Sequence, residues 1–173
     1  GYSFALRFAG GGSFCKDPQR FVVGGTENWI NRRFTYDRIP IDNPEDIIFL
    51  TEGVPLRGFD YDAQIGTRYS LFNAELRFPF FGYFAAGPIP IFFQSLTGVG
   101  FLDVGSAWNK ESLYRGTIKN TTGSVVTKDL LIGTGTGARV FLLGFLLKID
   151  VAWQYNLEGF STPKYYFSLG ADF

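Results

Sequence analysis

Residues 165–173 read Tyr-Tyr-Phe-Ser-Leu-Gly-Ala-Asp-Phe, and this stretch decides the fold class. Its large apolar side chains alternate with small or polar ones, and the sequence ends on Phe173. A strand presents successive side chains to opposite faces, so one face here is apolar and the other is not. Transmembrane β-barrels show this pattern, with apolar residues toward lipid, polar residues toward the lumen and aromatic residues at the interfaces. The stretch therefore predicts the last strand of such a barrel.

The composition is consistent with a barrel in a membrane. Aromatic residues make up 18% of the chain and charged residues another 18%, whereas a soluble domain has roughly 25% charged residues. The mean hydropathy is only +0.06, and no segment reaches the ~18 uncharged apolar residues that a membrane-spanning helix needs. Many aromatic residues without a spanning helix favour strands as the membrane-crossing elements.

The content of charge, histidine and cysteine excludes several function classes. The 16 basic and 16 acidic residues balance, which argues against a nucleic-acid partner. Histidine is absent and Cys15 is the single cysteine, so we expect no internal disulfide, no metal and no other cofactor. Because the sequence has neither a histidine base nor a G-x-S-x-G nucleophile motif, we expect no enzymatic activity.

About six segments alternate apolar and polar residues over the ~9–11 residues of a barrel strand. They lie near residues 2–9, 68–80, 95–108, 130–141, 145–156 and 165–173. Their charged residues lie opposite the apolar rows. The charges that we assign to the lumen are Arg7, Arg77, Arg139, Lys148 and Asp150, with the carboxylates Glu75 and Asp103. A soluble sandwich would also segregate its charges, so this pattern alone leaves both classes open.

The stretch from about residue 14 to 67 has no alternation of that length, and we predict a long loop there. Loops of this size are usually functional, and outer-membrane barrels place their long loops on the extracellular side. Six strands are too few to close a barrel, since the smallest bacterial ones have eight. The sequence has no methionine and no secretory signal. We therefore interpret residues 1–173 as the C-terminal part of one barrel domain in a longer protein.

Four motifs resemble the BamA-type outer-membrane superfamily, which includes TamA and the two-partner secretion transporters. In the family order, they are Pro55-Leu56-Arg57-Gly58-Phe59, the strand 73–79, the strand Phe101-Leu102-Asp103-Val104-Gly105 and the C-terminal stretch 165–173. The glycine pair at 24 and 25 departs from the commonest pattern, because about thirty residues separate it from the arginine motif. This variant is similar to the barrels fused to TolB-like β-propeller proteins of the Bacteroidota.

The resemblance implies that the long loop folds back into the lumen and that its arginine packs on the inner wall. We expect a loop-lock motif made of Leu56, Arg57, Gly58 and Phe59, with Phe59 on the smooth patch of glycines 133–137. The expected inner-wall partners are Glu75, Phe101, Asp103 and Gly105. A guanidinium is a planar fork of five donors, and neighbouring strands lie ~4.8 Å apart, so two carboxylates can flank it. The alternative is a solvated Arg57 in an external loop.

The resemblance also implies a C-terminal assembly signal. Its residues are Tyr165, Phe167, Leu169, Gly170 and Phe173. The alternative is an ordinary edge strand that faces lipid, and the two descriptions overlap because such a signal is read by strand pairing.

We therefore predict an all-β protein, a transmembrane antiparallel β-barrel of which this chain supplies about six strands and a loop inside the lumen. The resemblance implies the outer membrane of a Gram-negative bacterium. Its implied partners are the lipid bilayer with its lipopolysaccharide, the barrel-assembly machinery, and client or partner outer-membrane proteins. The implied function is assembly or insertion of outer-membrane proteins, or protein translocation. The alternative is a passive anchor for a periplasmic β-propeller or partner complex.

Overall fold

The computed structural model describes residues 1–14, 16–35, 50–53, 55–80, 96–110, 113–142 and 145–170. Their strands are β1 (Ser3–Gly12), β2 (Arg20–Val23), β3 (Leu50–Gly53), β4 (Gln64–Gly66), β5 (Arg68–Pro79), β6 (Thr97–Trp108), β7 (Thr117–Lys119), β8 (Val125–Thr127), β9 (Leu131–Leu142), β10 (Phe145–Gln154) and β11 (Lys164–Leu169). In the described residues, no helix has the length and apolar character needed to cross a membrane.

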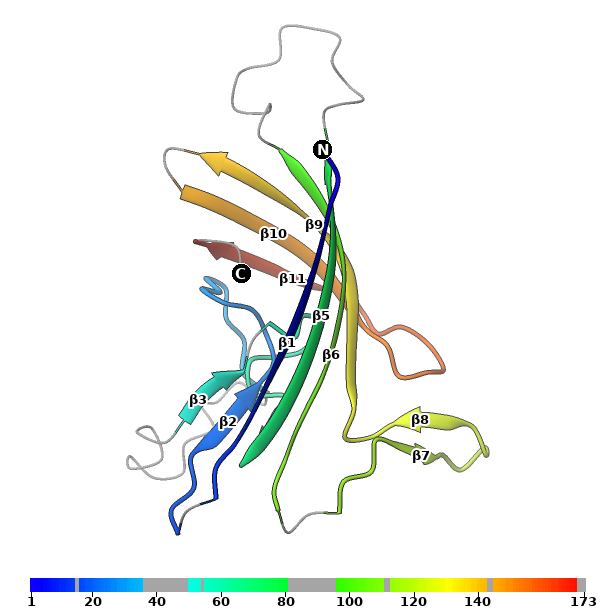
Figure 1. Ribbon diagram of the computed structural model, residues 1–173. Helices are drawn as coiled ribbons and strands as arrows, with labels where there is room; N and C mark the ends of the chain where they lie inside the picture. The colour runs from blue at the N-terminus through cyan, green and yellow to red at the C-terminus, as the bar shows by residue number, and fades with distance from the viewer. Residues whose placement is uncertain are drawn as a thin grey trace, which may run out of the picture.

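Six of the strands form one antiparallel sheet in the order β1-β5-β6-β9-β10-β11. Each strand pairs with the next long strand along the chain, as in an up-and-down barrel. The sheet twists and curls, and β2 and β3 lie on the side toward which it curls (Figure 1). In the described residues the sheet is open, with β1 at one end and β11 at the other.

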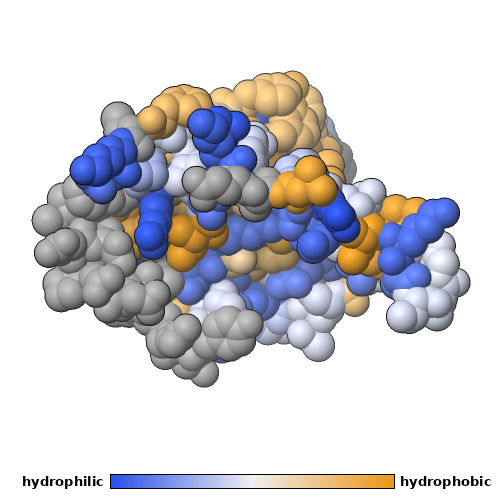
Figure 2. All heavy atoms as spheres, turned by 90° about the horizontal axis from the view of Figure 1, so that it is seen from below, coloured by the Kyte–Doolittle hydropathy of each residue, from blue (hydrophilic) through white to orange (hydrophobic). Residues whose placement is uncertain are grey.

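The two faces of the sheet invert the arrangement of a soluble protein. Its apolar side chains are exposed, with Phe4 at 65%, Phe8 at 79% and Phe145 at 65% of their surface, whereas Glu75 and Asp103 are 1% and 0% exposed. Viewed from below, hydrophobic atoms gather along one outer margin of the molecule and hydrophilic atoms lie around the middle (Figure 2). An apolar exterior around an ionic interior is what a barrel in lipid requires.

The predicted strands agree with the observed ones to within a few residues, but the stretch 14–67 is more ordered than one long loop. It contains a small sheet in which β2 pairs in parallel with β3 and antiparallel with β4. These strands have only three or four residues each, too few for alternation to show. Cys15, residues 36–49 and the final residues 171–173, which include Phe173, lie outside the described residues.

Candidate functional site

The inner wall of the site is built by two neighbouring strands. In the register of β5 and β6, Asn73 lies opposite Asp103 and Glu75 lies opposite Phe101. Residues two apart on a strand point to the same face, and cross-strand partners also share a face. All four side chains therefore project to the inside of the sheet, where they are buried.

Arg57 reaches this wall from the loop and binds both carboxylates. Its Nε donates to Asp103 Oδ2 at 2.7 Å and its Nη2 to Asp103 Oδ1 at 2.9 Å, which is a two-pronged contact. Its Nη1 donates to Glu75 Oε1 at 2.6 Å, and its backbone N–H donates to Asp103 Oδ2 at 3.0 Å. With 2% of its surface exposed, Arg57 is held inside the sheet and is not the solvated external arginine of the alternative.

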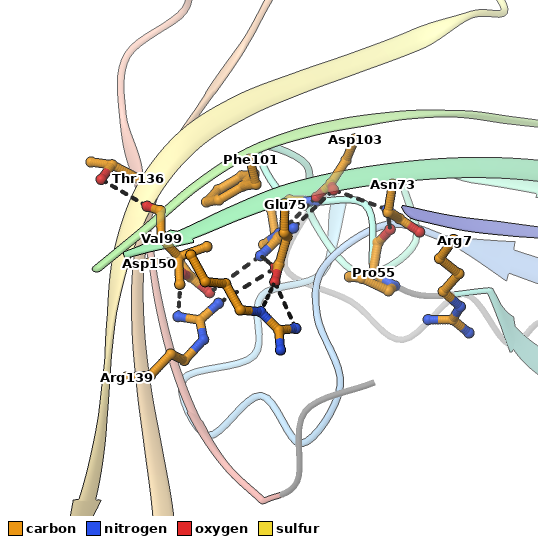
Figure 3. A network of polar contacts seen from close by, with 12 residues as sticks. Arg7, Pro55, Asn73, Glu75, Val99, Phe101, Asp103, Thr136, Arg139 and Asp150 are labelled. Carbon is orange, nitrogen blue, oxygen red and sulfur yellow. Dashed lines mark hydrogen bonds and ion pairs between the residues drawn. The ribbon is translucent and has the colours of Figure 1, made fainter. Parts of the chain in front are cut away.

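Two further wall residues complete the contacts around this arginine (Figure 3). The Phe101 ring lies under the guanidinium, with its centroid 3.5 Å from the Arg57 Cζ. The Asn73 amide donates to Asp103 Oδ1 at 2.9 Å and to the carbonyl of Pro55 at 2.7 Å. Asn73 therefore fixes both the carboxylate and the backbone that carries Arg57. We name the set of Arg57, Asn73, Glu75, Phe101 and Asp103 the arginine clamp.

A second layer of charges surrounds the clamp. Asp150 on β10 accepts from Arg139 Nη1 at 2.6 Å and lies 3.9 Å from Arg57 Nη1. Glu75 also accepts from Arg77 Nε and Nη2, at 3.1 and 3.0 Å. The loop arginine is thus tied electrostatically to carboxylates from β5, β6 and β10.

The network keeps Arg57 charged although it is buried. Burial alone would lower the pKa of Arg57, but the carboxylates of Asp103, Asp150 and Glu75 raise it above its usual value. A buried ion pair gives little net stabilisation, but removing one partner leaves an uncompensated charge and typically costs about 3–5 kcal/mol. The clamp therefore specifies where the loop sits more than it stabilises the sheet.

The glycines of β9 leave room for the loop, although in a different way from the one that the sequence predicts. A Cβ on Gly133 would lie 1.7 Å from the carbonyl oxygen of Arg57, whereas the nearest Phe59 atom would be 3.7 Å away. At Gly137 a Cβ would lie 1.9 Å from the Asp150 carboxylate. The patch thus receives the loop backbone and the ion pairs, and Phe59 touches only its edge. Phe59 instead packs in an apolar cluster with Val23, Leu56, Leu71 and Ala107.

The last strand holds the loop through Tyr166, which is buried on the inner face of β11. The Tyr166 hydroxyl accepts from the Gly58 N–H and donates to the Phe59 carbonyl, both at 2.8 Å. Gly58 has φ of +101°, a conformation that favours glycine. Tyr166 and Asn73 are the site residues that sequence reasoning missed. The signal for Asn73 was its place opposite Asp103 once the strand register is known.

The remaining candidate residues lie around this site. Arg7 is half-buried on β1 with its Nη1 3.4 Å from Glu27 of the loop. Lys148 is buried opposite Arg139 in the strand register, and it lines the same small cavity as Glu75. Gly105 is buried and packs close to Leu56. On β11, Tyr165, Phe167 and Leu169 point outward and are 56%, 41% and 42% exposed.

An open antiparallel sheet with an apolar exterior, an ionic interior and a loop clamped inside defines the chain as part of a transmembrane β-barrel. A comparison with protein-family models matches residues 3–173 to the Omp85 superfamily domain, and the chain belongs to the Omp85 superfamily. Neither a search of curated proteins nor a search of solved structures found a match. The membership confirms the resemblance to BamA-type barrels, while the fusion to a β-propeller stays a prediction. Superfamily members are outer-membrane proteins that assemble or translocate proteins and are not enzymes.

Proposed function

We propose that residues 1–173 are the C-terminal part of one outer-membrane barrel domain that assembles outer-membrane proteins or translocates proteins. Residues 14–67 form its in-lumen loop. The observation that carries the proposal is the buried arginine clamp, since a loop held by ion pairs inside the sheet has a defined position. Such a loop blocks a simple diffusion pore, and it provides a part that can engage a passing polypeptide.

The clamp connects the loop to the shape of the wall. Its carboxylates come from β5 and β6, Asp150 of the surrounding layer adds one from β10, and Tyr166 adds a contact from β11. Any separation of these strands pulls at least one carboxylate from the guanidinium, and buried unpaired charge is costly. Loop position and wall shape are therefore energetically coupled, which suits a protein that works by rearranging strands and uses no cofactor.

The proposed partners follow from the surfaces. The exposed apolar face fits the acyl chains of an outer membrane whose outer leaflet is lipopolysaccharide. Tyr165, Phe167, Leu169 and Gly170, with Phe173 at the end of the sequence, are proposed to be the signal that the barrel-assembly machinery reads. Client outer-membrane proteins are the third proposed partner.

A passive anchor is the second candidate, because the charges of the clamp are paired and buried like those of a permanent plug. In that case the barrel would hold a periplasmic β-propeller or partner complex, and the loop would only seal the lumen.

The discriminating experiment replaces Arg57 in the full-length protein in its native host. Arg57→Ala should still reach the outer membrane, but assembly or secretion of client proteins should fall at least tenfold. Arg57→Lys should also be impaired, because a lysine cannot make the two-pronged contact with Asp103. Arg33→Ala is the matched control, since Arg33 lies on the same loop with an exposed side chain.

Barrel insertion is checked by heat-modifiable migration and by expression level. Normal assembly by Arg57→Ala at normal levels, with the partner complex still retained at the membrane, would contradict the proposal and favour the anchor.

A further inference from the structure

One arginine lies on the outer face of the sheet, opposite in direction to those of the clamp. Arg68 begins β5, and the next residue, Tyr69, points inward and packs on Phe21 of the loop with the ring centroids 4.6 Å apart. Because successive residues of a strand point to opposite faces, Arg68 points toward the apolar exterior. Since β5 pairs with β1 on one side and with β6 on the other, Arg68 does not lie at an edge of the sheet.

Aromatic side chains lie on both sides of this arginine. Its Cζ lies 4.9 Å from the centroid of the Phe14 ring, and Trp108 is its register partner on β6. The Trp108 ring lies 5.4 Å from the Tyr114 ring. A Cβ on Gly12 would lie 3.1 Å from the Phe14 ring and 3.5 Å from the Arg68 Cγ, so this glycine leaves the space that both side chains occupy. We name Phe14, Arg68, Trp108 and Tyr114 the outer arginine site.

The guanidinium of Arg68 has no anionic partner among the described residues. Its Nε is buried without a hydrogen-bond acceptor there, and no carboxylate of the described residues pairs with it. Arg57, by contrast, is saturated by two carboxylates on the inner face. A buried donor without an acceptor is destabilising, and an anion from the surrounding lipid would remove this cost.

The position of Arg68 along β5 determines its depth in a membrane. Phe78, ten positions further along the strand, also points outward, and its ring stacks with Phe80 at 6.4 Å. With a rise of ~3.3 Å per residue and a tilt of ~40°, ten residues span ~25 Å along the membrane normal. This span equals the height of the apolar band of a barrel, and aromatic residues lie at both of its ends, as in the two interfacial girdles. Arg68 therefore lies at the level of the lipid headgroups.

The headgroups at this level belong to the outer leaflet. The strands β7 and β8 project from the end of the sheet where β6 ends and β5 begins (Figure 1). The long connections 13–67 and 109–130 start at the same end, and barrels of this class have their long loops on the extracellular side. Lys110, Arg115 and Lys128 of the second connection are exposed, and such basic residues strengthen the attraction to anionic lipid.

We propose that the outer arginine site binds a phosphate group of an outer-leaflet lipid, which in the outer membrane is lipopolysaccharide. A guanidinium matches a phosphate with two parallel hydrogen bonds, and tryptophan and tyrosine suit the boundary between headgroup and acyl chain. The outward row of Phe72, Ala74 and Leu76 further along β5 contacts the acyl chains of the same molecule. This inference rests on the proposed function, because it assumes the outer membrane, and it assigns the lipid partner to particular residues.

The test compares two forms of one lipid on the full-length protein in a non-ionic detergent. One probe is lipopolysaccharide with a fluorophore on its sugar, and the other is the same material with its lipid phosphates removed. Protein-free micelles give the background. The measured quantity is the ratio of the two dissociation constants, which does not depend on the fraction of protein that is active. Heat-modifiable migration shows that the barrel of each variant is folded.

The parent protein should bind the phosphorylated lipid at least tenfold more tightly than the dephosphorylated one. Arg68→Gln should lower this preference to less than threefold, and Phe14→Ala should lower it in part. Arg68→Lys should keep part of the preference, because a lysine still binds phosphate as a point charge. Arg20→Gln is the matched control and should keep all of it, since it removes the same charge from an exposed position on β2 of the loop.

Equal binding of the two lipids by the parent protein would overturn the inference, and so would an undiminished preference in Arg68→Gln. Inorganic phosphate is the third probe, because it separates a lipid site from a site for a free anion. Binding of inorganic phosphate that depends on Arg68, without a preference between the two lipids, would show that the lipid assignment is wrong.

Failure of the proposed function is a separate result. If Arg57→Ala leaves assembly intact while the lipid preference depends on Arg68, the lipid site stands and the assembly function does not. If Arg57→Ala abolishes assembly while Arg68→Gln keeps the preference, the assembly function stands and the lipid site does not.

Discussion

Tyr166, near the end of the chain, accepts a hydrogen bond from the Gly58 N–H at 2.8 Å, across 108 positions of sequence. The same hydroxyl donates to the Phe59 carbonyl, so one side chain serves two successive backbone groups of the loop. This contact makes the last strand of the sheet part of the loop site and links the end of the chain to the arginine clamp.

Tyr166→Phe should loosen the loop while leaving the sheet formed. The change leaves a buried N–H and a buried C=O without this partner, and each such group costs about 1–3 kcal/mol. Tyr165→Phe on the outer face is the control, since Tyr165 is 56% exposed. Hydrogen exchange at Gly58 should become at least tenfold faster in Tyr166→Phe and stay unchanged in Tyr165→Phe. Equal protection in both variants would show that the hydroxyl does not hold the loop.

Gly133→Ala should expel the loop from its place on β9. The added Cβ would lie 1.7 Å from the Arg57 carbonyl oxygen, so the loop backbone must move. Gly100→Ala in the adjacent strand β6 is the matched control, because nothing lies within 4 Å of the Cβ it would add. Protease cleavage within residues 50–62 of the folded protein should rise in Gly133→Ala alone. Equal cleavage in the two variants would show that Gly133 is not needed to keep the loop in place.

Leu76→Arg tests the lipid-facing side of the sheet. Leu76 is 48% exposed on β5, and an arginine on the lipid face of a barrel costs about 2–4 kcal/mol at the bilayer midplane and less near the interfaces. Leu113→Arg is the control, since Leu113 is 75% exposed outside the sheet strands. The free energy of unfolding in lipid vesicles should fall for Leu76→Arg and change little for Leu113→Arg. An unchanged value for both would mean that this face does not meet lipid.

The strands and their faces could be predicted because alternation is a local property of the sequence. The alternation of Phe4 and of Glu75 with their immediate neighbours predicts which face of the sheet each side chain occupies. The arginine clamp was predicted because the motif around Arg57 resembles that of a known family. Other contacts depend on register and on the path of the loop. The bonds of Asn73 to Pro55, and of Asn31 to Tyr165 and Phe167, join segments whose relative position no local pattern specifies. The small sheet of β2, β3 and β4 was not predicted, because strands of three or four residues are too short to show an alternating pattern.

The most direct test of the central claim is a double-mutant cycle between Arg57 and Asp103 in the full-length protein. The free energy of unfolding in lipid vesicles is measured for the parent, Arg57→Ala, Asp103→Ala and the double variant. If the loop is held inside the sheet by this pair, the single losses should not add, and the coupling energy should reach about 2 kcal/mol. Additive losses, with coupling below about 0.5 kcal/mol, would contradict the account, because they would show that Asp103 does not hold Arg57 and its loop inside the sheet.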